Sequence, residues 1–145
     1  YNIWESFKLC KIRGRRNMNV LICIGDEHDP KNLIEAAKES LGDSGGELWA
    51  TYSIDKDDVM KEGSPRQQSL DQGLEYIYTH GAKIAFLRGN SIVQGLLDLS
   101  EKNKIDLVVI DMDAFTGDLQ RAHSTFLRKL PEKVRILELS GREEL

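Results

Sequence analysis

The stretch LVVIDMDAFTGDLQRAHST, which runs from Leu107 to Thr125, decides the fold class. Its first four residues, Leu107–Ile110, are all apolar, as is typical of a strand that is buried on both faces. A turn with two aspartates and a Thr-Gly pair follows, and Asp118–Leu130 then has helical spacing up to Pro131. A strand, a turn and a helix in this order predict one unit of an α/β protein.

The same alternation recurs along the chain from residue 18 onward. Asp29-Pro30 and Ser64-Pro65 are typical helix starts, Gly42 is a typical helix end, and either Asn90 or Ser91 would cap a further helix. The other predicted strands are Val20–Ile24, Leu48–Ser53, Lys83–Leu87 and Val134–Leu139. Long connections between strands require parallel pairing, and right-handed crossovers favour a doubly wound sheet. We therefore predict an α/β fold with a five-stranded parallel sheet and helices on both faces.

Composition excludes several classes of protein. A chain of 145 residues with 40% hydrophobic residues suits one globular domain with a proper core. The net charge of −4 gives no reason to expect a nucleic-acid partner, and no run approaches the roughly 20 apolar residues of a membrane span. Cys23 lies inside an apolar run, so the two cysteines, Cys10 and Cys23, favour a cytoplasmic protein without disulfides.

The charge is unevenly distributed between the start and the rest of the chain. Residues 1–16 carry +4, so residues 17–145 carry −8. The first segment combines aromatic and apolar residues with Lys-Ile-Arg-Gly-Arg-Arg, which suits the inner face of a membrane. We therefore divide the chain into a basic amphipathic segment or juxtamembrane linker (1–16) and one domain (17–145). A surface helix or solubilising tail is the favoured interpretation of the basic segment, and a juxtamembrane position is the alternative.

Ligands of doubly wound sheets bind outside the carboxyl ends of the strands, where the strand order reverses. The two turns to consider are Gly25 to Asp29 and Asp111 to Asp118.

The segment RGNSIVQGLLDLSEKNKIDLVVIDMDAFTG, residues 88–117, resembles the universal stress protein family. It has that family's glycine after the third strand, then a helix, then an apolar strand that enters a glycine-bearing turn. The resemblance covers roughly residues 18–139. It implies the strand order 3-2-1-4-5 and, in many members, a homodimer that forms through the last strand.

In members that bind ATP, the resemblance implies a phosphate-binding pattern of Gly, two residues, Gly, nine residues and Gly-Ser/Thr. Here the three glycine positions fall on Asp111, Ala114 and Ser124, and the hydroxyl position falls on Thr125. Only Thr125 matches, although Gly117 matches a glycine that is often present inside that turn.

A narrower likeness connects the chain to the stress-protein-like domain of the potassium-responsive sensor kinase, some members of which bind cyclic di-AMP. In LWATY, residues 48–52, Ala50 and Tyr52 match the motif that the resemblance implies. Gly25, Asp26 and Glu27 stand where that motif has its two serines.

Acidic residues follow both strands whose ends would face a bound phosphate. They are Asp26, Glu27, Asp111, Asp113 and Asp118. A carboxylate about 6 Å from a phosphate costs roughly 3 kcal/mol at an effective dielectric constant near 20. We therefore predict that ATP binding is weak or absent, because side chains also block the approach that glycines allow.

Three other interpretations of these acids remain open. Asp111 and Asp113 could hold Mg²⁺, which would bridge to phosphates, with His28 nearby. The acids could instead cap turns and helices, as Asp118 would in the first turn of its helix. Asp-Met-Asp also resembles the nucleophile motif of haloacid dehalogenase phosphatases, but Thr116 comes one residue late and too few residues follow.

The leading hypothesis is a non-enzymatic regulatory domain of the universal stress protein type, cytoplasmic and homodimeric, with a degenerate ATP site and no cofactor. It includes possible attachment to a membrane transporter or sensor in the same chain. The alternative is a module that still binds ATP or cyclic di-AMP. The residues of a retained nucleotide site would be Gly25, Asp26, Glu27, Ala50, Tyr52, Asp111, Ala114, Gly117, Ser124 and Thr125.

Overall fold

The computed structural model describes residues 18–25, 29–42, 45–54 and 62–139. The predictions about residues 1–16, Asp26, Glu27 and His28 lie outside these ranges. None of the described helices is long and apolar enough to cross a membrane.

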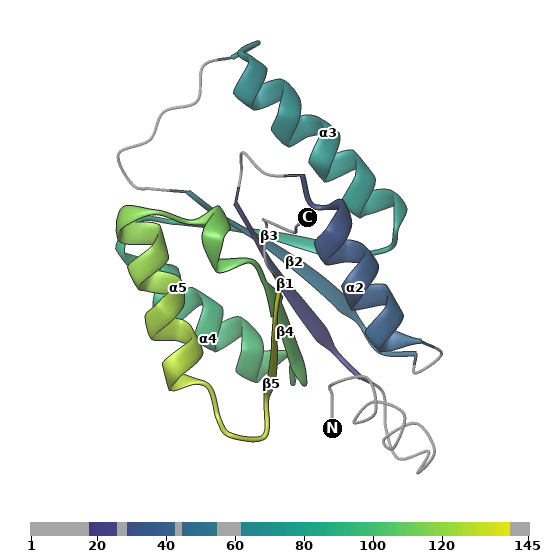
Figure 1. Cartoon of the computed structure of the whole chain (residues 1–145), viewed down its shortest axis with the longest axis vertical. Coiled ribbons are helices and arrows are strands. Elements are labelled where there is room, and N and C mark those ends of the chain that lie inside the picture. The colour runs from purple at the N-terminus through teal and green to yellow at the C-terminus, as the bar shows by residue number, and fades with distance from the viewer. Residues whose placement is uncertain (1–17, 26–28, 43–44, 55–61, 140–145) are drawn as a thin grey trace.

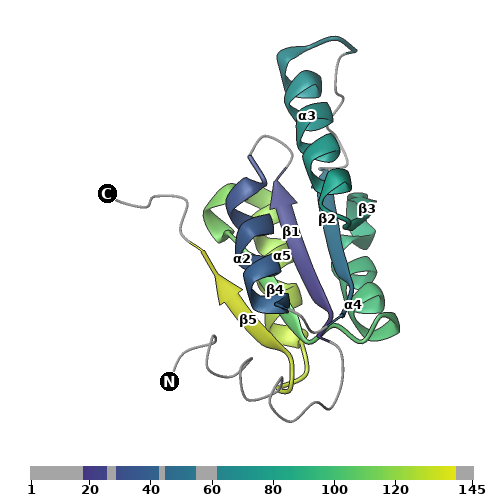
Figure 2. The same ribbon diagram turned by 90° about the vertical axis from the view of Figure 1, so that its right-hand side faces the viewer.

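One parallel sheet forms the centre of the molecule, with strands in the order β3-β2-β1-β4-β5 (Figures 1 and 2). The strands are β1 (Val20–Gly25), β2 (Leu48–Ile54), β3 (Lys83–Arg88), β4 (Leu107–Ile110) and β5 (Arg135–Glu138). The helices are α2 (Lys31–Leu41), α3 (Pro65–Thr79), α4 (Ile92–Lys102) and α5 (Gly117–Lys129), with short 3₁₀ helices η1 (Gly89–Ser91) and η2 (Met112–Ala114). The predicted fold class and strand order are confirmed.

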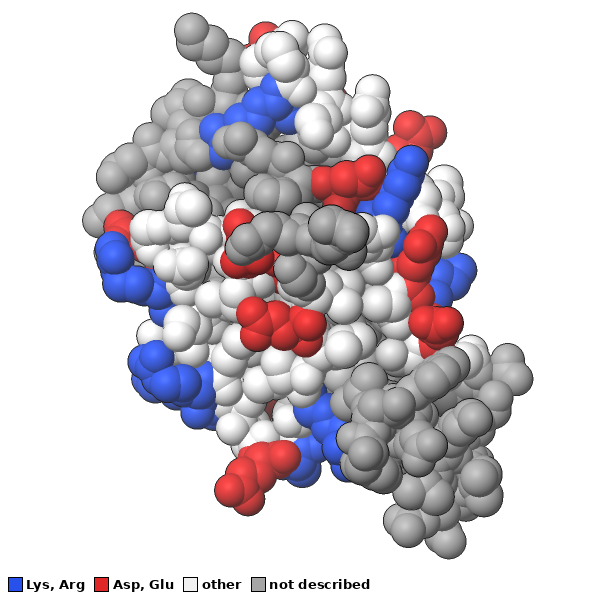
Figure 3. Space-filling view, in the orientation of Figure 1, with Lys and Arg blue, Asp and Glu red and all other residues white. Residues whose placement is uncertain are grey.

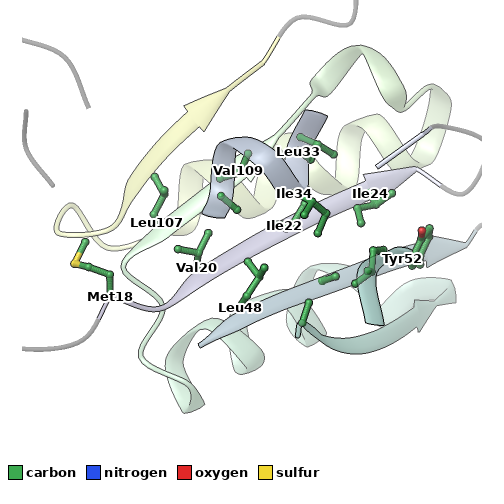
Figure 4. Close-up of a cluster of buried hydrophobic side chains, with 14 residues drawn as sticks. Met18, Val20, Ile22, Ile24, Leu33, Ile34, Leu48, Tyr52, Leu107 and Val109 are labelled. Atoms are coloured by element: carbon green, nitrogen blue, oxygen red, sulfur yellow. The ribbon is translucent and has the colours of Figure 1, made fainter. Parts of the chain in front are cut away.

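The sheet separates two hydrophobic cores, because successive side chains of a strand point to opposite faces. On one face, Val20, Ile22 and Ile24 of β1 pack with Leu33 and Ile34 of α2 (Figure 4). The opposite face belongs to the second core, to which α4 and α5 contribute. Every residue of β1 and β4 is buried, which explains why the sequences of both strands are continuous apolar runs.

Helix ends follow the predicted chemistry with two corrections. Ser64 caps α3 by accepting the N–H of Gln67 at 3.2 Å, as predicted. Asp29 accepts the N–H of Lys31 at 3.0 Å, but Pro30 precedes α2 and does not occupy its first turn. Ser91, one of the two predicted alternatives, occupies the N-cap position of α4, but its hydroxyl donates to the carbonyl of Arg88 at 3.2 Å and does not bond the first turn of the helix.

Candidate functional site

The candidate site is the turn between β4 and α5, at the edge where the chain also leaves β1 (Figure 1). This turn contains η2, and Asp111 is its N-cap. The Asp111 carboxylate accepts the N–H of Asp113 at 3.0 Å, and its carbonyl accepts the N–H of Ala114 at 3.0 Å. The N–H of Phe115 bonds the carbonyl of Met112 at 3.2 Å. The backbone N–H groups of Asp113, Ala114 and Phe115 therefore all form hydrogen bonds within the turn.

Two buried rings lie next to this turn. Phe115, which directly follows η2, stacks on His123 of α5 with ring centroids 3.8 Å apart and planes 15° apart. Both side chains are completely or almost completely buried. Stacked rings of this kind supply apolar contact area close to the carboxyl ends of the strands.

The His123 ring also forms a polar contact with the sheet. Its Nδ1 lies 2.8 Å from the carbonyl of Leu119, and a carbonyl can only accept, so Nδ1 carries the proton. Nε2 is then the acceptor for the hydroxyl of Ser53 on β2, at 3.3 Å. Ser53 pairs in register with Gly25 at the end of β1. Burial lowers the pKa of His123, although its hydrogen bond with Leu119 opposes this.

The geometry of Ser53 and His123 is that of a nucleophile and a base, but neither side chain reaches solvent. A substrate therefore has no access to the hydroxyl in this arrangement. The pair satisfies two polar groups inside the core.

Acidic groups at the turn do not form a metal cluster in the described part of the chain. There, no group of three or more His, Cys, Asp or Glu residues could hold a metal ion. Asp118 lies in the first turn of α5, as predicted, and pairs with Arg121. Binding of Mg²⁺ by Asp111 and Asp113 stays a prediction.

Comparisons with known proteins are informative only at the level of three-dimensional structure. No protein-family model and no curated protein matches the chain. Solved universal stress proteins match it over most of its length. One, in complex with cAMP, has a TM-score of 0.56 at 15% identity and covers 88% of this chain and 100% of its own.

Two further structures agree with this result. A universal stress protein from Archaeoglobus fulgidus has a TM-score of 0.53 at 15% identity, covering 88% of this chain and 97% of its own. One from Lactobacillus plantarum has a TM-score of 0.54 at 12% identity, covering 86% and 99%. The chain has the universal stress protein fold. At these identities the likeness shows the fold and not a shared ligand.

Within the universal stress protein fold, the positions of the ATP pattern do not form a glycine cradle. Asp111 directly precedes η2 and Ala114 is its last residue, and the backbone N–H groups there are used as described above. Ser124 and Thr125 are the eighth and ninth residues of α5. Only the first four N–H groups of an α-helix lack an intrahelical partner, so those of Ser124 and Thr125 are used by the helix.

The two residues that match the cyclic di-AMP motif lie in the core. Ala50 and Tyr52 are buried on the face that packs against α2 and α3, so neither reaches solvent. Gly25 ends β1 and is also buried. Gly117 begins α5 with φ of +57°, a conformation in which glycine is favoured, and a Cβ there would meet open space.

Ser53, Phe115 and His123 were not predicted from the sequence. The sequence held one signal for His123: it is three residues before Phe126, a spacing that puts both on one face of a helix. Both are the buried residues of α5. Arg121, Arg128 and Lys129 of α5 are exposed. Figure 3 shows basic and acidic side chains distributed over this face of the molecule.

Proposed function

We propose that this chain is a non-enzymatic regulatory domain with the universal stress protein fold and a degenerate ATP site. The observation that carries the proposal is the turn after β4. Its N–H groups at residues 113–115 bond within the turn, and Ser124 and Thr125 lie inside α5. A phosphate is bound by N–H groups that point outward, and this turn supplies none from residues 113–115.

The charge of Asp111 adds to this geometric obstacle. Its carboxylate would repel a phosphate at the same turn. The two effects can be separated by mutation, because Asp111→Ala removes the charge and releases the N–H of Asp113 but leaves α5 unchanged. If repulsion alone prevented binding, that variant would bind ATP.

We expect isothermal titration of the chain with ATP, AMP and cyclic di-AMP to show no binding tighter than a Kd of about 1 mM, the weak end of specific recognition. The same result is expected for Asp111→Ala, because α5 still uses the N–H groups of Ser124 and Thr125. Glu132→Ala, which removes an exposed acid beyond the C-terminal end of α5, is the matched control. Micromolar binding of ATP by the unmodified chain without a divalent ion would overturn the proposal.

The second candidate is a nucleotide-binding module, and the cAMP complex of a protein with the same fold favours it. In this case Asp111 and Asp113 would bind Mg²⁺, which would bridge to the phosphates. Binding that appears only with Mg²⁺ and disappears in Asp111→Asn would support this alternative.

We further propose that two copies of the chain associate through β5. This strand is at the edge of the sheet, and Ile136 exposes 41% of its surface there. An exposed edge strand with an apolar residue is a template for pairing with another chain.

Substituting Ile136→Asp is expected to convert a dimer into a monomer in analytical ultracentrifugation, because the new charges would face each other across the pair. Tyr78→Asp is the matched control, since Tyr78 exposes 75% of its surface on α3 and is not on β5. A dimer that survives Ile136→Asp but not Tyr78→Asp would place the interface at α3.

The place of action that we propose is the cytoplasm, at the inner face of a membrane if residues 1–16 connect the domain to a transporter or sensor. The composition of that segment, with aromatic residues followed by basic ones, supports this proposal.

A further inference from the structure

The two helices that cover one face of the sheet leave β5 partly uncovered. On this face α2 packs on β1 and β4, and α3 packs on β3. Figure 2 shows β5 at the edge of the sheet, beyond α2. Leu137 of β5 and Leu139, which follows the strand, pack at the margin of the core under α2 and are only half-buried. They form an apolar strip that no helix among the described residues fully covers.

The side of α2 that borders this strip can be identified from its contacts. Lys31 lies over the ring of Tyr76 on α3, with its Nζ 5.9 Å from the ring centroid, so that side of the helix faces α3. Ala36 comes five residues later, about 140° around the helix, and packs half-buried against the same core. Glu39, three residues after Ala36, is exposed next to it. The border of the strip on α2 is therefore a small apolar residue with an acid beside it.

The chain enters the domain on the same face. Met18, the first described residue, is 6% exposed and belongs to the same core as Leu107 (Figure 4). Two residues later, Val20 is in register with Leu107, which in turn is in register with Arg135 of β5. β5 is therefore only two strand spacings, about 10 Å, from the point of entry. Sixteen residues span about 24 Å even in the compact form of an α-helix, so residues 1–16 are long enough to reach the strip.

The composition of residues 1–16 complements this surface. They include five large apolar or aromatic residues, Tyr1, Ile3, Trp4, Phe7 and Leu9. They carry a charge of +4, whereas residues 17–145 carry −8, so electrostatic attraction favours contact between the two parts of the chain.

We propose that residues 1–16 dock on the strip formed by Leu137 and Leu139 of the same chain. Their apolar side chains cover the two leucines, and their basic side chains lie toward Glu39 and water. Ile136 belongs to the opposite face of β5, on the side of the core under α4 and α5, so docking leaves the proposed dimer contact free. A docked segment is withheld from anionic lipid, so docking and membrane binding exclude each other.

The test is an NMR experiment on the full chain with a nitroxide spin label at position 6. The label is attached to the cysteine of a Ser6→Cys, Cys10→Ser variant, and a nitroxide broadens the amide signals of residues near it. Cys23 does not react with the label, because it is fully buried and burial raises the pKa of its thiol to about 12.

The signals of Leu137 and Leu139 are expected to be lost, and that of Phe86 on β3, the opposite edge strand, is expected to remain. In a mixture of spin-labelled chain without isotope and isotope-labelled chain without spin label, all signals should remain, because docking occurs within one chain. Loss of the signals in that mixture would identify a second copy as the occupant and overturn the proposal. Unchanged signals at β5 in the spin-labelled chain would also overturn it, and binding of the same chain to phosphatidylglycerol vesicles would then identify an anionic lipid surface as the partner.

Substitutions on both sides of the contact separate docking from mere tethering. Trp4→Ser with Phe7→Ser removes two apolar side chains from the segment and is expected to restore the signals at β5. Leu139→Ser is expected to restore the signal of Leu137 and to keep the strand pairing, because the backbone N–H of residue 139 bonds the carbonyl of Ile110 at 2.8 Å. Ile136→Asp, on the opposite face, is the matched control and is expected to leave the loss unchanged. If the signals stayed lost in the Trp4→Ser, Phe7→Ser variant, tethering alone would account for the loss and the proposal would be wrong.

Discussion

Gly46→Ala is expected to destabilise the chain by at least about 3 kcal/mol, a large fraction of the stability of a domain of this size. A Cβ at this position would lie 1.5 Å from the carbonyl oxygen of Met18 and 2.3 Å from its carbonyl carbon. These atoms belong to the backbone directly before β1, so no side-chain rotation can relieve the overlap. The neighbouring N–H of Val20 bonds the carbonyl of Glu47 at 2.9 Å, so movement of the two segments would also disturb the start of the β1–β2 pair.

Gly63→Ala is the matched control for this experiment. Gly63 has φ of +77°, and a Cβ there would meet nothing within 4 Å. Its cost is therefore limited to the conformational strain of a non-glycine residue, about 1 kcal/mol. Urea unfolding followed by circular dichroism measures both variants. Equal stability of the two would mean that the close approach of Gly46 to Met18 does not exist in solution.

Acidification is expected to destabilise the fold through His123. An unfolded chain protonates this residue near the ordinary pKa of 6.5, whereas burial lowers the pKa in the folded state. Between these two values the unfolded state binds more protons, so the free energy of unfolding decreases as the pH falls. The loss amounts to at most about 1.4 kcal/mol per pH unit within this window, and the contribution is fully present above pH 6.5.

His123→Leu should remove this part of the pH dependence, because leucine does not titrate. At pH 8 the variant should also be less stable by about 1–3 kcal/mol, since the buried Ser53 hydroxyl loses its acceptor. His80→Leu serves as the control, because that ring bonds the carbonyl of Tyr76 in a half-buried position on α3. Urea unfolding between pH 5 and pH 8 gives the comparison. A slope that remains in His123→Leu would exclude His123 as its source.

The fold was predictable because its signals are local. The strand Leu107–Ile110 was predicted with its observed bounds, since four consecutive apolar residues between polar ones leave little choice. Gly42 ends α2 with φ of 54°, as its residue type indicated. The last strand is shorter than predicted, Arg135–Glu138, because Val134 and Leu139 continue the apolar pattern without joining the strand.

The candidate site was less predictable because its contacts are long-range. Ser53 and His123 are separated by 70 residues and come together only when α5 covers the sheet. Ala50 and Tyr52 match a ligand motif by spacing, but the face of β2 on which they lie is covered by helices. Asp111 was interpreted chiefly as a repelling charge, whereas the structure shows that it also organises the turn by capping η2.

The start of α5 at Gly117 has a consequence for any attempt to engineer nucleotide binding into this protein. Because α5 begins at Gly117, Ser124 and Thr125, which the ATP pattern would place against a triphosphate, lie inside a continuous helix. Substitutions to glycine at these positions would destabilise the helix and would not free the backbone N–H groups of Ser124 and Thr125. Building a phosphate site at these positions would therefore require a different backbone between β4 and Thr125, and side-chain substitutions alone would not supply it.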